Sequence, residues 1–167
     1  GVMRLWVAAI SDAELPIVAP PAAAEYKIHL TTAPEILQQH PQEAESLKDI
    51  DGYGLHVEGK ELTIYGTMSK GPLNAIYRLL RKNTDIIWAR PDPQYGTFFT
   101  KSKDVFFDVS DGVDIPKFHV RGWQVFFPCP TNEFMWNVHN CATWTSGRGN
   151  AAANRERPEW GVWEEAC

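Results

Sequence analysis

Residues 52–83 hold the feature that most constrains the fold of this chain. In GYGLHVEGKELTIYG (52–66), four aliphatic residues alternate with polar neighbours on either side of Gly59: Leu55, Val57, Leu62 and Ile64. Such alternation around a central turn is typical of a β-hairpin with one buried face. The next stretch, TMSKGPLNAIYRLLRKN (67–83), changes the apolar spacing from two to about 3.6 residues, which indicates an amphipathic helix.

The helix in 67–83 has a start and a stop signal. Ser69 is the expected N-cap, Pro72 suits the first turn, and the last turn is basic. Its apolar stripe consists of Leu73, Ile76, Tyr77 and Leu80. We expect this stripe to pack on the apolar face of the hairpin, since both faces must be removed from water.

Further elements are weaker in the sequence. Short runs at 5–10 and 25–30 are typical of strands, and 33–47 predicts a weak helix interrupted at Pro41. More strands are expected in DIIWARP (85–91) and TFFTKSKDVFFDV (97–109), before a turn-rich connector at 110–116. Residues 1–114 therefore predict an α+β domain, with a largely antiparallel or mixed sheet and helices packed on one face.

Composition and charge exclude several classes of function. The chain has 167 residues, enough for one ordinary domain and part of a second. A net charge of −5 argues against a nucleic-acid partner and against an anionic membrane surface. No apolar run approaches the roughly 18 residues of a membrane span. The N-terminal GVMRLWVAAISD has one basic residue and a short apolar stretch, so it does not predict a signal peptide.

The cysteines and histidines do not predict a metal site. Cys129, Cys141 and Cys167 leave at least one thiol unpaired, and their spacing matches neither a zinc ribbon nor a Cys-x-x-Cys motif. His119 and His139 lie near two of these cysteines but without the spacing of zinc ligands. We therefore expect no metal and no cofactor.

The composition changes after residue 114. IPKFHVRGWQ (115–124) alternates as a strand does, and a helix is expected from about 133 to 143, capped by Thr131 or Asn132. Five of the seven tryptophans lie in this part of the chain: Trp123, Trp136, Trp144, Trp160 and Trp163.

The stretch GYGLHVEGKELTIYGTMSKGPLNAIYRLL resembles the non-catalytic α+β domain that precedes the barrel in family 20 β-hexosaminidases and family 67 α-glucuronidases. The resemblance extends over about residues 25–109. It rests on a hairpin that ends in Gly66, a short turn containing Ser and Gly, and the helix register of Ala75, Ile76, Tyr77, Leu79 and Leu80. In those enzymes a connector that ends in proline leads to a first barrel strand with an Arg-Gly pair. Pro116, Arg121 and Gly122 fit that pattern.

The resemblance implies that residues 115–167 begin a TIM-like barrel, with FHVRGWQ as its first strand, TNEFMWNVHNCATW as the following helix and an aromatic-rich tail. The chain would be the N-terminal accessory part of a carbohydrate-active glycoside hydrolase. It would brace the catalytic barrel and could supply one wall of the sugar site. Its implied partners are a carbohydrate and the remainder of the barrel. The resemblance also suggests a secreted or periplasmic protein.

Arg121 has two interpretations. The matching arginine of the family 20 enzymes holds the terminal sugar, and a guanidinium can donate paired hydrogen bonds to vicinal hydroxyls or to a uronic carboxylate. Alternatively, Arg121 makes a structural salt bridge, to Asp108, Asp111 or Asp114.

Aromatic and polar neighbours of Arg121 carry the same ambiguity. Trp123, Trp136 and Trp144 could stack on sugar faces or fill a core. His139 and Asn140 could donate hydrogen bonds at the mouth of the barrel or be structural.

No catalytic residue is predicted. Glycoside hydrolysis normally needs two carboxylates about 5–10 Å apart, whereas the acids at 104–114 are typical of turns and Glu164–Glu165 of solvated charge. Whether the chain belongs to an enzyme therefore stays open. The alternative is a self-contained, non-catalytic module that binds a carbohydrate or a protein.

Overall fold

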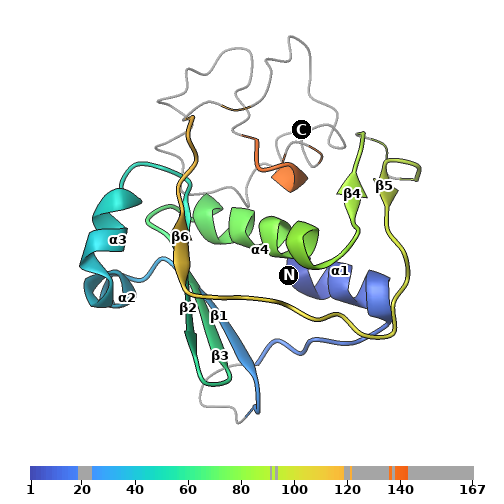
Figure 1. Cartoon of the computed structure of the whole chain (residues 1–167), viewed down its shortest axis with the longest axis horizontal. Helices are drawn as coiled ribbons and strands as arrows, with labels where there is room; N and C mark the ends of the chain where they lie inside the picture. The colour runs from blue at the N-terminus through green and yellow to red at the C-terminus, as the bar shows by residue number, and fades with distance from the viewer. Residues whose placement is uncertain are drawn as a thin grey trace.

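The computed structural model of this protein describes residues 1–18, 24–90, 92, 94–118, 121, 136 and 138–142. Figure 1 shows a small sheet with the long helix α4 across one face and the N-terminal helix α1 beside α4. The fold is α+β, as the sequence predicts. Among the described residues, no helix is long and apolar enough to cross a membrane.

The main sheet is mixed and has the strand order β1-β3-β2-β6. Strand β1 runs parallel to β3, while β2 is antiparallel to both β3 and β6. The strands are β1 (Lys27–Thr31), β2 (Tyr53–Glu58), β3 (Glu61–Tyr65) and β6 (Gly112–Asp114). The predicted strand at 25–30 and the predicted hairpin are both confirmed. Gly59 in the hairpin turn has φ +59°, a left-handed conformation that favours glycine.

Helix α4 (Lys70–Asn83) begins after Ser69, as expected, but it buries two faces. Ala75 and Leu79 pack on Tyr53 and Ile64 of the sheet. The predicted stripe lies in a second cluster instead, with α1 and Trp88, so the expectation that it covers the hairpin was wrong. The helix sits between the sheet and α1, and a helix between two layers needs apolar residues on both sides.

Residues 5–10 are not a strand. They belong to helix α1 (Val2–Ser11), whose buried residues Met3, Val7 and Ile10 recur every three to four positions. The misreading has a physical cause: every residue of LWVAAI is apolar, so the run contains no periodic contrast. The period appears only when Met3 is included.

The remaining elements of the domain are short. The predicted helix at 33–47 forms as α2 (Pro34–Gln39) and α3 (Pro41–Ser46), divided at Pro41 as expected. Between these helices, the His40 ring stacks on Tyr65 at 4.8 Å. A two-stranded ribbon comprises β4 (Ile87–Trp88) and β5 (Thr97–Phe98).

Two predictions for residues 97–116 need correction. Only Thr97–Phe98 is a strand in the predicted run 97–109, and the predicted connector contains β6. Side-chain hydrogen bonds hold this turn-prone sequence beside β2. Asp111 Oδ1 accepts from the Val57 amide at 2.7 Å, and the Tyr53 hydroxyl donates to Asp114 at 3.0 Å.

Half of the predicted strand at 115–124 lies outside the described residues, and its described part, 115–118 and Arg121, is not a strand. Pro116 has no amide hydrogen and cannot extend the pairing of β6. Phe118 is 70% exposed. Of the predicted helix at 133–143, the structure describes Trp136 and residues 138–142, and Trp136, Val138 and His139 are helical.

Candidate functional site

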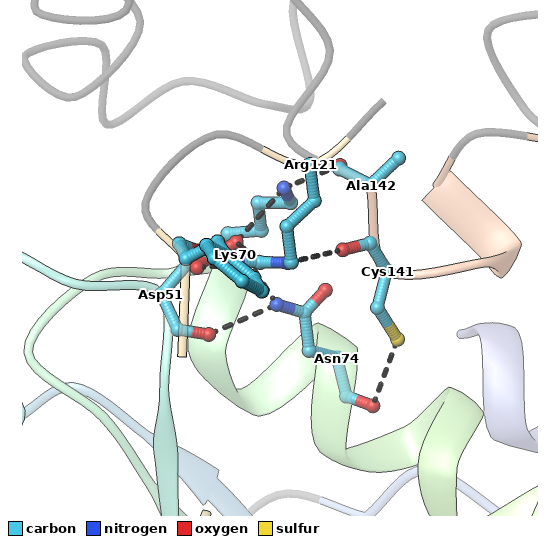
Figure 2. Close-up of polar contacts among 7 residues, drawn as sticks. Asp51, Lys70, Asn74, Arg121, Cys141 and Ala142 are labelled. Atoms are coloured by element: carbon cyan, nitrogen blue, oxygen red, sulfur yellow. Dashed lines mark hydrogen bonds and ion pairs between the residues drawn. The ribbon is translucent and has the colours of Figure 1, made fainter. Parts of the chain in front are cut away.

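The described residues of the C-terminal part lie against α4, where buried polar groups from distant parts of the chain meet (Figure 2). Asp51, in the turn before β2, is 4% exposed, Lys70 is 2% exposed and Asn74 is 3% exposed. Lys70 opens α4 and Asn74 follows one turn later, so both side chains lie on one side of the helix. We call Asp51, Lys70, Asn74 and Arg121 the Asp51 cluster.

Asp51 is the acceptor at the centre of this cluster. Lys70 Nζ lies 2.9 Å from Asp51 Oδ2. Asn74 Nδ2 donates to the backbone oxygen of Asp51 at 2.9 Å and to Oδ2 at 3.1 Å. Arg121 Nη2 donates to both carboxylate oxygens at 2.7 Å. A buried carboxylate with this many donors is compensated for the loss of water.

Arg121 uses every nitrogen of its guanidinium on the protein. Besides Nη2 on Asp51, Nε donates to the Cys141 carbonyl at 3.2 Å and Nη1 to the Phe118 carbonyl at 2.6 Å. The salt bridge considered for Arg121 therefore exists, but its partner is Asp51 and not Asp108, Asp111 or Asp114.

The same cluster fixes the segment 141–142. Lys70 Nζ donates to the Ala142 carbonyl at 2.6 Å, and the Cys141 thiol contacts the Asn74 carbonyl at 3.7 Å. Cys141 has φ 55°, an uncommon conformation for a residue with a side chain. Side chains from α4, the turn before β2 and residue 121 thus hold one short piece of the C-terminal part.

The electrostatics match this arrangement. Burial would raise the pKa of Asp51, but the charge of Lys70 and the hydrogen bonds from Arg121 and Lys70 outweigh burial and lower it. Burial lowers the pKa of Lys70, and the charge of Asp51 opposes that shift. Two cations therefore share one carboxylate in a poorly hydrated place. The ionised carboxylate is engaged as an acceptor, so Asp51 is not poised as a general acid.

Trp136, His139 and Asn140 pack farther along α4. Trp136 Nε1 donates to the Trp88 carbonyl at 2.9 Å, and Asn140 Nδ2 donates to the same carbonyl at 3.2 Å. The His139 ring lies 4.9 Å from that of Tyr77 and 5.2 Å from that of Trp88. These three predicted site residues therefore contact the interior of the α+β domain.

Burial also controls the titrating groups in this segment. It lowers the pKa of His139 to about 4, so the imidazole is neutral at pH 7. Burial raises the pKa of the Cys141 thiol, against the opposing charge of Arg78. A protonated, buried thiol is a poor nucleophile.

The structure describes four predicted site residues: Arg121 joins the Asp51 cluster, and Trp136, His139 and Asn140 contact Trp88. Trp123 and Trp144 lie outside the described residues. Sequence reasoning missed Asp51, Lys70 and Asn74. One signal was available, because Lys70 and Asn74 lie seven and three positions before the buried Tyr77, a spacing that places all three on one side of a helix. Within the described ranges, no group of His, Cys, Asp or Glu side chains could hold a metal ion.

Comparisons with known proteins add no family to this picture. Neither the models of protein families, nor the curated proteins, nor the solved structures gave a match to this chain. The resemblance to the glycoside hydrolase accessory domain therefore stays a prediction that rests on the quoted residues.

Proposed function

We propose that this chain is the N-terminal accessory part of a carbohydrate-active glycoside hydrolase, in which the α+β domain braces the beginning of a catalytic barrel. The observation that carries the proposal is the contact between Arg121 and Asp51. Arg121 is the residue that fits the Arg-Gly pair of the resembled barrels, and its carboxylate partner belongs to the α+β domain.

Two features support a bracing role for Arg121 rather than direct sugar contact. Its Nε, Nη1 and Nη2 all donate to protein oxygens, and only 21% of its side chain is exposed. A sugar would have to compete with a carboxylate and two carbonyls for these donors. The sugar contacts in this proposal are consequently assigned to tryptophans that the sequence analysis named, Trp123 and Trp144.

The bracing role is tested by hydrogen–deuterium exchange on the full chain and on Arg121→Gln. We expect Arg121→Gln to speed exchange in peptides that contain residues 138–142, because the contact to the Cys141 carbonyl is lost, while β2 and β3 keep their protection. Arg90→Gln is the matched control, since Arg90 is exposed and outside the Asp51 cluster. Equal exchange at 138–142 in both variants would refute bracing by Arg121.

The carbohydrate assignment needs a separate experiment. Tryptophan fluorescence is titrated with N-acetylglucosamine, glucuronic acid and their oligomers. A saturable change that Trp123→Phe or Trp144→Phe removes is the expected result. No response to any of these sugars would contradict the carbohydrate assignment and leave the alternative, a self-contained binding module for a protein.

A further inference from the structure

A surface pocket of about 410 Å³ lies between α4, β2 and residues 108–110, apart from the Asp51 cluster. This volume falls within the range of small-molecule sites. Its apolar lining comes from Leu55, Leu79 and Val109. Three cationic side chains of the second half of α4 also line it: Arg78, Arg81 and Lys82.

The two arginines of the pocket are available to a ligand. Arg78 and Arg81 are three residues apart on α4, so they lie on the same side of the helix, and both are exposed. Within the part of the chain that the structure describes, neither makes a salt bridge or a side-chain hydrogen bond. Lys82 differs, because its Nζ lies 3.3 Å from Asp108 Oδ2.

The other polar groups of the pocket can orient a ligand. Ser110 lines it and has a hydroxyl that can donate or accept. Tyr53 also lines it, but its proton is directed to Asp114 at 3.0 Å, so its oxygen is left as an acceptor. One carboxylate, Asp108, stands against three cations in the lining, in a chain whose net charge is −5.

We propose that this pocket binds a small organic carboxylate with a ring-sized body. The carboxylate pairs with the guanidinium groups of Arg78 and Arg81, whose planar donors match it. The ring lies over Leu55, Leu79 and Val109, and its hydroxyl groups, where it has them, reach Ser110 and Tyr53. This proposal does not rest on the sugar contacts proposed for Trp123 and Trp144.

The test is a ligand titration followed by amide NMR on the full chain. Glucuronate and benzoate are the probes, glucose and benzamide are their neutral counterparts, and inorganic phosphate tests for a general anion site. We expect both carboxylates to shift amides of residues 53–55, 78–82 and 108–110, with millimolar or tighter affinity. We expect the neutral counterparts to leave these amides unchanged. Raising the salt concentration should weaken binding.

The variants are Arg78→Gln, Arg81→Gln and their combination, with Lys48→Gln as the control. Lys48 is an exposed cation that does not line the pocket. We expect at least a tenfold weaker affinity for the double variant and no change for Lys48→Gln. Four results would each overturn the proposal. They are an unchanged affinity in the double variant, equal amide shifts with glucose and glucuronate, a response to phosphate alone, and no response to either carboxylate at about 10 mM. A response to the carboxylates that Trp123→Phe abolishes would assign the ligand to the proposed sugar contacts instead, and would likewise overturn it.

Discussion

Replacing Asp51 by asparagine should destabilise the protein far more than a surface substitution of the same kind. Asparagine keeps the size of the side chain, so no cavity is created and the effect is electrostatic. Lys70 is 2% exposed and has its charge 2.9 Å from Asp51. Without that carboxylate its ammonium group stays buried beside Arg121, with no counterion in the Asp51 cluster.

The expected size of the effect follows from this geometry. Removing one partner of a buried ion pair costs about 3–5 kcal/mol, because the other charge is left uncompensated. A domain is stable by only about 5–15 kcal/mol in total, so Asp51→Asn should move the unfolding midpoint strongly. The matched control is Asp12→Asn. Asp12 also pairs with a lysine at 2.8 Å, but the side chains of Lys101 and Asp12 are 65% and 76% exposed, and such pairs contribute less than about 1 kcal/mol.

Urea denaturation followed by circular dichroism measures both variants, and a second substitution tests the cause. Lys70→Met removes the buried cation that has lost Asp51, so Asp51→Asn/Lys70→Met should be more stable than Asp51→Asn by about 1–3 kcal/mol. If Asp51→Asn does not fold, recovery of folding in the double variant serves the same purpose. A loss no larger than that of Asp12→Asn, or no recovery in the double variant, would refute the reasoning.

Two further predictions concern His139 and Gly71. The pKa of His139 is about 4 in the folded protein against about 6.5 when unfolded, so the unfolded state binds more protons between these values. The free energy of unfolding should therefore fall by up to about 3 kcal/mol from pH 7 to pH 4. Denaturation curves recorded across that range should show a weaker pH dependence for His139→Phe. An unchanged slope of the free energy of unfolding against pH would contradict the burial of the ring. Gly71→Ala should cost about 1–3 kcal/mol, because its Cβ would lie 2.1 Å from the Gly52 oxygen, whereas Gly112→Ala meets no atom within 4 Å. Thermal unfolding compares the two, and equal stabilities would show that α4 and Gly52 are not in this contact.

Local periodicity was enough to predict the centre of the fold. The hairpin and α4 were found because their apolar residues contrast with polar neighbours at two different spacings. The run LWVAAI was wrongly predicted as a strand because it is uniformly apolar. The helical spacing of α1 can be recognised only when Met3 is included and when its packing on α4 is known. Strand β6 was missed because the hydrogen bonds that hold it come from Val57 and Tyr53, which are distant in sequence.

The Asp51 cluster could not be predicted either, because its residues are distant in sequence. Arg121 was singled out from its sequence context, but no local pattern connects it with Asp51, which is 70 positions away. Asp51 is one of two acids in its turn, beside Asp49, and only the fold shows that it is buried. Lysine side chains are almost never fully buried unless they are paired. The burial of Lys70 could therefore not be predicted without knowing that Asp51 is its partner.

The most direct test of the central claim, that Arg121 braces the C-terminal part on the α+β domain, is the NMR spectrum of the arginine side chains. A guanidinium with Nε and both Nη groups engaged rotates slowly and exchanges its protons slowly with water. We predict that Arg121 gives resolved, protected Nη protons, identified by their loss in Arg121→Gln, while Arg78 and Arg81 give averaged signals. An averaged, rapidly exchanging Arg121 signal, indistinguishable from those of Arg78 and Arg81, would contradict the account.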